Sequence, residues 1–220
     1  MIGYRRRVAA AVALVVTLLL IREGWAGAPT DQLRAQIDRV VKVLEEPELK
    51  KEHKQKERRH VVRKIAEEIF DFTETAKRSL GRHWQQRTPA ERKEFVDLFA
   101  DLLERSYLSK IELYNGEKIT YLGDTVDGDY ATVRTRLLAK RGTEIPVDYR
   151  MVRQGDRFSV YDVMIEGVSL VANYRTQFNK IIQTSSYQEL VRKMKSKQAE
   201  FSDEPKRTST TGSHRGRSPA

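Results

Sequence analysis

The sequence of 220 residues contains no cysteine, which excludes disulfides, thiolate nucleophiles and thiolate metal sites. Stability must therefore come from an apolar core. Histidine is also scarce, and the four that occur, His53, His60, His83 and His214, lack the spacing of a metal site. Phosphate-binding loops, GxSxG and dinucleotide fingerprints are missing as well. We expect no metal, no cofactor and no enzyme built on these motifs.

Long hydrophobic runs are lacking except near the N-terminus. Arg5, Arg6 and Arg7 precede an apolar stretch from Val8 to Ile21, and the small residues of Ala26-Gly27-Ala28 follow it. This order predicts a cleaved secretory signal peptide over residues 1–28. An uncleaved anchor is the alternative, although the run is shorter than the roughly 20 residues needed to cross a bilayer. No cysteine follows the cleavage site, which excludes a lipoprotein.

The remaining chain divides into one domain and a tail. Residues 29–202 carry regular apolar patterns and suffice for one domain with a sizeable core or an internal cavity. Residues 203–220 are rich in Ser, Thr, Gly, Pro and Arg without apolar periodicity, which predicts a disordered basic tail. The formal charge is +10, of which residues 1–28 carry +3 and residues 203–220 carry +2. The remaining charge makes the domain only moderately basic.

The densest basic run lies between residues 50 and 64. It contains Lys50, Lys51, Lys54, Lys56, Arg58, Arg59, Arg63 and Lys64. Two glutamates interrupt it and no aromatic residue is interleaved, whereas proteins that bind single-stranded nucleic acid use aromatic stacking platforms. We expect no nucleic-acid partner. The run is either a solvated helix surface or a surface that docks on anionic lipid headgroups or an acidic partner.

Apolar residues at helical spacing predict helices on both sides of a β-rich segment. The first helix spans Leu33 to Leu44 and ends near Pro47. The second runs as one helix from about Arg58 to Trp84, and the last lies near residues 187–199.

The third helix has the clearest start signal. Thr88 is its N-cap, Pro89 occupies the first helical position, and Glu91 completes a capping box. We expect this helix to carry a broad apolar stripe and to end before Asn115-Gly116.

Four β-rich segments with short turns between them predict strands, and those at residues 131–137 and 145–151 alternate apolar and polar residues. They lie at residues 119–126, 131–137, 145–151 and 158–165. Such short connections force antiparallel neighbours. The expected fold is therefore α+β, with a curved four-stranded antiparallel meander, helices packed on it, and an apolar cavity enclosed between them.

The junction of the last strand and the following helix is unusually apolar. Strand 158–165 has apolar groups on both faces, which predicts a sheet covered on each side. After Gly167 the apolar positions change to helical spacing. They form one stripe, which comprises Val168, Val171, Tyr174, Phe178, Ile181 and Ile182.

The order of residues at this junction, YDVxIEGVSLVxNYRxQF, closely resembles the C-terminal signature of the MlaC-type family of periplasmic phospholipid carriers, also known as toluene-tolerance proteins. The resemblance covers roughly residues 31–197. Upstream it includes Phe70, Asp71, Phe72, Leu80, Gly81, Trp84, Phe95, Leu102, Leu103 and Tyr107. At Phe158 the family more often has Trp, so an aromatic residue is retained.

The resemblance implies a periplasmic protein that carries phospholipid between an outer-membrane lipoprotein complex and an inner-membrane ABC transporter with an MCE-type subunit. Such carriers maintain the lipid asymmetry of the outer membrane and have no enzymatic activity. The resemblance also implies that the cavity holds acyl chains and leaves the headgroup near solvent. Some relatives belong to hopanoid-associated loci, so a triterpenoid is an alternative cargo.

Twelve residues from the predicted helices and strands are expected to contact the lipid. They are Phe72, Trp84, Phe99, Leu103, Tyr107, Val147, Tyr149, Val163, Ile165, Val171, Tyr174 and Phe178. Each aromatic residue among them is alternatively a plain core residue.

Four acids, Asp71, Asp148, Asp162 and Glu166, lie nearest to apolar surroundings. One of them could act as the general base of an isomerase or hydrolase that uses the same pocket. Alternatively they bind backbone amides, cap the helix near Val168, or pair with Arg150 and Arg175. A third interpretation is a periplasmic adaptor that binds only proteins and has a filled core.

Overall fold

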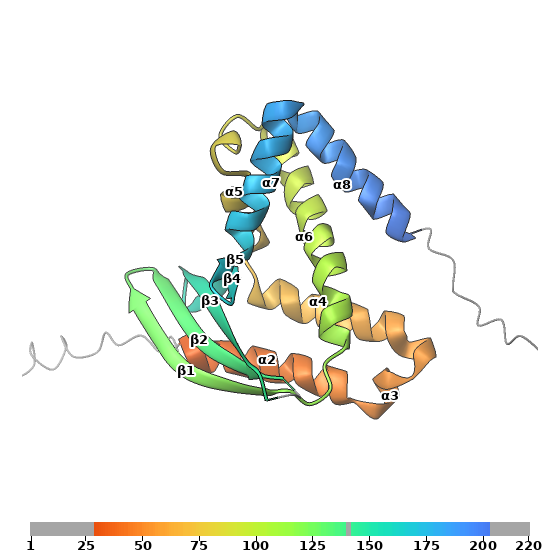
Figure 1. Cartoon of the computed structure of the whole chain (residues 1–220), viewed down its shortest axis with the longest axis vertical. Coiled ribbons are helices and arrows are strands. Elements are labelled where there is room, and N and C mark those ends of the chain that lie inside the picture. Colours follow the sequence, from red (N-terminus) through yellow and green to blue (C-terminus); the bar gives the residue numbers. More distant parts are fainter. Residues whose placement is uncertain (1–28, 140–141, 203–220) are drawn as a thin grey trace, which may run out of the picture.

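The computed structural model describes residues 29–139 and 142–202 (Figure 1), so the predicted signal peptide and tail lie outside the described residues. The helices are α2 (Pro29–Glu45), α3 (Pro47–Lys50), α4 (Gln55–Ile69), α5 (Phe72–Leu80), α6 (Pro89–Glu112), α7 (Leu170–Thr184) and α8 (Tyr187–Ser202), with short 3-10 turns at Glu52–Lys54 and Gly81–His83. The strands are β1 (Lys118–Asp127), β2 (Tyr130–Leu138), β3 (Glu144–Gln154), β4 (Arg157–Ile165) and β5 (Val168–Ser169). Across these ranges, no helix combines the length and apolarity needed to cross a membrane.

The strands form one antiparallel sheet in the order β1-β2-β3-β4-β5, which confirms the α+β class and the meander. The predicted count of four strands is wrong. A two-residue turn at Glu166 and Gly167, both with positive φ, folds the chain back so that Val168 pairs with Ile165. Val168 therefore belongs to β5 rather than to the helix, which begins at Leu170.

We expect a Glu166→Asn variant to be more stable than the wild type. Glu166 has a φ of 51°, which side chains other than Asn, Asp and Gly adopt at a cost of about 1 kcal/mol. The variant creates the Asn-Gly pair that two-residue hairpin turns prefer. The urea midpoint should rise with an unchanged slope, whereas Glu166→Ala should bring no such gain. Equal midpoints for the Asn and Ala variants would contradict this account.

The predicted second helix is interrupted at Phe70 and Asp71, which separate α4 from α5. Phe70 is extended and forms a parallel bridge with Val160, and the Asp71 backbone N–H donates to the Val160 carbonyl at 2.8 Å. The Asp71 carboxylate then accepts from the Glu74 backbone N–H as the N-cap of α5. The prediction of one continuous helix is wrong because pairing with β4 replaces the helical hydrogen bonds at this point.

The predicted start of α6 is confirmed. The Thr88 hydroxyl accepts from the Glu91 backbone N–H, and the Glu91 carboxylate accepts from the Thr88 backbone N–H at 2.8 Å. Pro89 occupies the first turn. The helix runs to Glu112 and stops before Asn115-Gly116, as expected.

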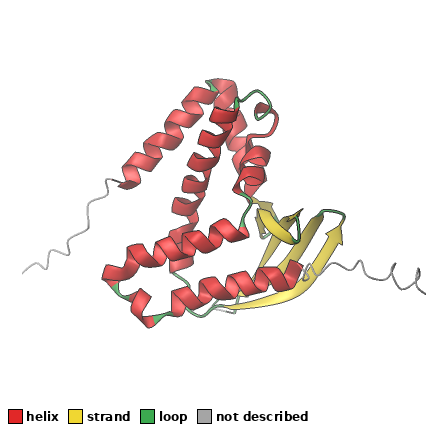
Figure 2. Ribbon diagram, turned by 180° about the vertical axis from the view of Figure 1, so that it is seen from behind, coloured by secondary structure: helices red, strands yellow, loops and turns green. Residues whose placement is uncertain are grey.

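Helices cover both sides of β4. On one side α2 and α4 lie next to each other, and Leu33, Ile65 and Ile69 pack on the sheet (Figure 2). On the other side α5 and α7 approach β4, and the Thr75 hydroxyl donates to the Tyr161 carbonyl at 3.0 Å. Four of the first six residues of β4 are consequently buried whichever way they point, which confirms the predicted double covering for this strand.

Candidate functional site

Two large apolar clusters, rather than one, hold the described residues together. The helical cluster joins α5, α6, α7 and α8 through buried residues such as Phe95, Phe99 and Leu190. The sheet cluster joins α2 and α4 to the sheet through residues such as Leu33, Val133 and Met151. Domains of this size usually have one contiguous core. The residues at the margins of the two clusters are therefore candidates for a binding surface.

The inner face of the sheet, which we define as the face that carries Val133 and Met151, becomes progressively more exposed along the strands. Directly paired residues point to the same side, so Val147, Tyr149, Val163 and Ile165 all lie on this face. Met151 is fully buried, Val147, Tyr149 and Val163 are half-buried, and Ile165 is 39% exposed. Apolar surface thus extends beyond the part that α2 and α4 cover.

The middle of α6 and the start of α7 show the same intermediate burial. Leu103 and Tyr174 pack against the edge of the helical cluster, while Tyr107 lies one turn further along α6. Burial raises the pKa of Tyr107, and the Tyr174 hydroxyl raises it further. In Figure 1, α6 and α7 rise beside the sheet and α4 crosses near the lower end of α6.

Four of the other five predicted contacts, Phe99, Phe178, Trp84 and Val171, are buried in the core. Phe99 and Phe178 meet edge to face at 5.3 Å, within an aromatic group that also includes Phe95, Tyr174 and Tyr187. Trp84 belongs to the same cluster, and Val171 is 2% exposed. Phe72 is half-buried and stacks on Phe70 at 5.7 Å.

The structure therefore separates the twelve predicted residues into groups. Those with accessible apolar surface on the sheet, α6 and α7 are Leu103, Tyr107, Val147, Tyr149, Val163, Ile165 and Tyr174. We call these seven residues the inner surface. Sequence reasoning missed Tyr121 and Val168, which lie in the same cross-strand row as Val147 and Ile165. Ile119 and Tyr121 are two positions apart in a predicted strand, and this spacing could have indicated that Tyr121 lies on an apolar face.

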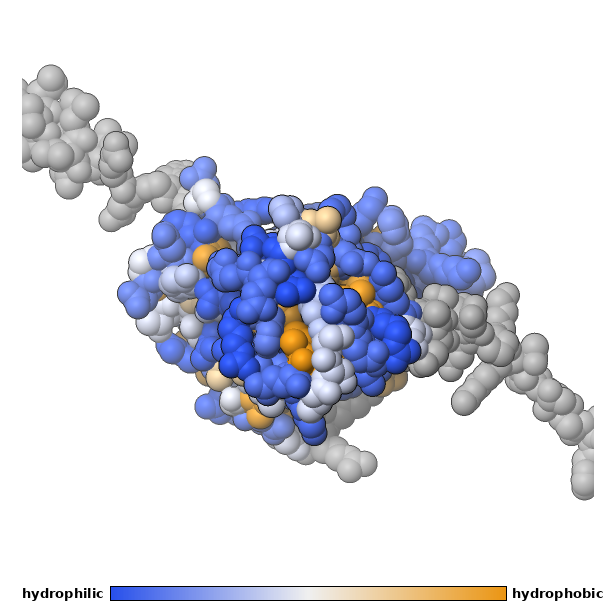
Figure 3. Space-filling model, turned by 90° about the horizontal axis from the view of Figure 1, so that it is seen from above, coloured by the Kyte–Doolittle hydropathy of each residue, from blue (hydrophilic) through white to orange (hydrophobic). Residues whose placement is uncertain are grey.

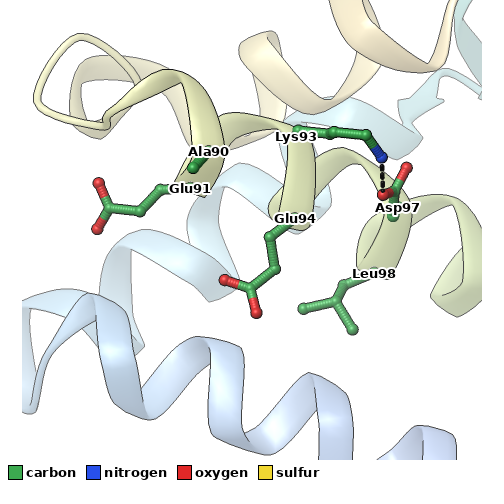
Figure 4. A pocket seen from close by; sticks show the side chains of 6 residues that line it. All are labelled: Ala90, Glu91, Lys93, Glu94, Asp97 and Leu98. Carbon is green, nitrogen blue, oxygen red and sulfur yellow. Dashed lines mark hydrogen bonds and ion pairs between the residues drawn. The ribbon is translucent and has the colours of Figure 1, made fainter.

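Two hollows elsewhere on the surface do not involve these residues. One, of about 540 Å³, is lined by side chains from the first turns of α6, including Glu91, Lys93 and Glu94 (Figure 4). The other, of about 400 Å³, lies beside the end of α2. Both are open and have charged rims. The face in Figure 3 is likewise mainly hydrophilic, with narrow apolar strips. Neither hollow is the apolar cavity predicted between the sheet and the helices, which therefore stays a prediction.

Arginines of the basic run connect α4 to α6. Arg59 binds Glu112 with two hydrogen bonds of 3.0 and 2.7 Å, and Arg58 contacts the same carboxylate at 3.1 Å. Burial by itself would raise the pKa of Glu112, but the hydrogen bonds from Arg59 and Arg58 lower it overall. Arg63 adds a contact of 2.7 Å to Glu104. We call these contacts the α4–α6 clasp.

The clasp changes the interpretation of the basic run. Arg58, Arg59 and Arg63 are used within the molecule, while Lys51 and Lys54 pair with nearby glutamates. The run is therefore more than a solvated helix surface. Beneath the clasp, Leu44, Val62 and Leu108 form a small third cluster, which joins α2 and α4 to α6.

Asp162 is buried and serves a structural role. Its carboxylate accepts from the Val171 backbone N–H at 3.0 Å and from the Ser169 hydroxyl at 2.6 Å, and it lies 3.6 Å from Arg150. The alternatives in which this acid binds a backbone amide and pairs with Arg150 are thus confirmed, whereas the N-cap of α7 is Ser169, whose hydroxyl accepts from the Ala172 backbone N–H. Arg175 instead donates to the Arg78 carbonyl at 3.0 Å.

We expect Asp162→Asn to destabilise the fold by about 1 to 3 kcal/mol, because the bond from the Val171 backbone N–H loses its charge assistance and an amide nitrogen cannot accept the Ser169 hydroxyl. Lipid uptake at saturation should remain. Urea unfolding and native mass spectrometry measure the two quantities separately. Asp148→Asn, on the same face of the neighbouring strand, is the matched control and should leave both unchanged. Loss of lipid uptake in a folded Asp162→Asn protein would assign this acid to the binding site.

Comparisons with known proteins agree with this architecture. Residues 34–196 match the family model described as MlaC protein. A solved structure of a phospholipid-binding protein from Ralstonia solanacearum, in complex with a phospholipid, has a similar fold with a TM-score of 0.69. The two sequences are 22% identical, and the match covers 80% of this chain and 99% of that one.

Proposed function

Because the chain belongs to the MlaC family of phospholipid-binding proteins, we propose that it is a periplasmic carrier that binds one phospholipid on the inner surface and moves it between membranes. The proposed donors and acceptors are an outer-membrane lipoprotein complex and an inner-membrane ABC transporter with an MCE-type subunit. This traffic would maintain the lipid asymmetry of the outer membrane.

The observation that carries the proposal is the half-buried apolar surface at the margins of the two clusters. A packed core would bury Val147, Tyr149 and Val163 as completely as it buries Met151. Their remaining apolar surface is an unfavourable contact with water that acyl chains would remove. The similar fold of a protein that was solved with a phospholipid adds support.

The energetics explain why such a carrier needs no covalent chemistry. Two acyl chains contain about 30 methylene groups, and transfer of each to water costs about 0.8 kcal/mol, or about 25 kcal/mol in total. A protein surface that replaces water along the chains removes most of this barrier. Hydrocarbon offers no hydrogen-bond pattern, so we propose weak selectivity among acyl chains.

Mass spectrometry of residues 29–202, expressed with the native leader and purified from a periplasm without detergent, tests the proposal. Native spraying should show a stoichiometric adduct, and denaturing conditions should release it as phospholipid. A triterpenoid adduct would identify a triterpenoid, and not a phospholipid, as the cargo. A bare protein mass, with no uptake from added phospholipid vesicles, would contradict the carrier and favour an adaptor with a filled core.

A further inference from the structure

A buried polar group without a partner lies beside the inner surface. Tyr121 is on β1, directly opposite Thr135 of β2, and its hydroxyl oxygen is buried with no hydrogen-bond partner among the described residues. The neighbouring Thr135 hydroxyl donates to the Val147 carbonyl at 2.8 Å. Buried hydroxyls without partners are unfavourable and rare in folded proteins. Phenylalanine would fill the same space without this cost.

A second tyrosine lies on the same face of the sheet, two strands away. Tyr149 lies on the same face of β3, and burial raises its pKa to about 12. The pKa of Tyr121 is raised first by burial and then by the nearby Tyr149 and Asp38. Both hydroxyls are therefore protonated at neutral pH and available as hydrogen-bond donors. The Arg34 guanidinium lies 4.6 Å from the centre of the Tyr121 ring and holds it in place.

An apolar row of side chains extends across the sheet from Tyr121. From Tyr121 and Thr135, the cross-strand row continues through Val147 and Ile165 to Val168 on the same face. Ile165 is 39% and Val168 64% exposed. A ligand that satisfies the two hydroxyls and also covers this row must combine hydrogen-bond acceptors with long apolar chains.

We propose that Tyr121 and Tyr149 donate hydrogen bonds to the acyl ester carbonyls of a diacyl glycerophospholipid. This inference rests on the proposed carrier function and adds the part of the lipid that is recognised. Each ester carbonyl accepts hydrogen bonds and donates none, which matches two neutral donors. The acyl chains leave the esters along the apolar row. A site that hydrogen-bonds a ligand group discriminates against an analogue without that group.

A competition between ester and ether lipids tests the inference. The mature protein is incubated with vesicles that contain equal amounts of diacyl and dialkyl phosphatidylethanolamine of the same chain length, and native mass spectrometry gives the ratio of bound species. The wild type should prefer the ester lipid about fivefold for each hydrogen bond, equivalent to about 1 kcal/mol at 1.4 kcal/mol per factor of ten.

Tyr121→Phe and Tyr149→Phe should each lower this preference while ether-lipid binding stays constant. Tyr130→Phe, on the opposite face of β2 where Tyr130 is 47% exposed, is the control and should keep the wild-type ratio. The lipid-free Tyr121→Phe protein should melt at the same or a higher temperature, because an unpaired buried hydroxyl is removed.

Two results would overturn the inference. One is an equal uptake of ester and ether lipid by the wild type. The other is a Tyr121→Phe variant that melts at a lower temperature and keeps the wild-type ratio, which would show a structural role for the hydroxyl. Uptake of neither lipid would instead contradict the carrier function itself, so the two failures are distinguishable.

Discussion

A Val147→Glu variant is expected to stay folded and to lose its lipid. Val147 is half-buried on the inner face, so a glutamate there can keep contact with water while its charge repels acyl chains. We expect stability to fall by no more than about 2 kcal/mol and lipid occupancy by more than about tenfold. Circular dichroism with urea unfolding checks the fold, and native mass spectrometry checks the occupancy.

Val133→Glu is the matched control on the neighbouring strand. Val133 lies on the same face but is fully buried in the sheet cluster, so a charge there has no access to water. It should destabilise the protein by about 3 to 5 kcal/mol or unfold it. Val147→Leu should preserve both fold and lipid. If the Val147→Glu protein is folded and binds lipid normally, Val147 does not belong to the lipid-binding site. If the variant unfolds, Val147 is a core residue.

The second large effect concerns the α4–α6 clasp. Because the chain has no cysteine, an Arg59→Cys, Glu112→Cys double variant can be joined selectively by a short cleavable bis-maleimide. The clasp connects a helix of the sheet cluster to a helix of the helical cluster, so we expect lipid exchange to require its opening. Crosslinking should slow exchange with labelled vesicles by more than about tenfold, and cleavage of the linker should restore it.

The control crosslink joins two helices that share one cluster. Arg39 of α2 pairs with Glu68 of α4 in the same way, and both helices pack on the sheet. An Arg39→Cys, Glu68→Cys variant with the same linker should exchange lipid at the rate of its unlinked form. Unchanged exchange in the α4–α6 crosslink would show that the two clusters need not separate.

Local signals predicted much of the fold correctly. The capping box at Thr88 and Glu91 joins residues three positions apart, so it forms without contacts to distant parts of the chain. Strand alternation placed Val147 and Tyr149 on one face of their strand, because the side-chain period of a strand is fixed, while the register of the sheet added Val163 and Ile165 to that face. The family signature at residues 157–182 led to the family that the comparisons establish.

Contacts between distant segments decided what the sequence could not show. Helical periodicity continues through Phe70, yet pairing with Val160 breaks the helix there. Val168 fits the apolar stripe of α7 but pairs with Ile165 as a strand. Phe99 and Tyr107 are aromatic residues of the same helix, yet Phe99 is fully buried and Tyr107 is only half-buried.

The sequence by itself therefore determined most of the element types, the capping box of α6, the alternation within strands and the family. These depend on backbone hydrogen bonds and on spacing within a few residues. Only the tertiary structure decided which apolar residues form solid core and which keep accessible surface. Burial depends on which elements meet, and the split between a helical cluster and a sheet cluster arises from contacts between residues far apart in the chain.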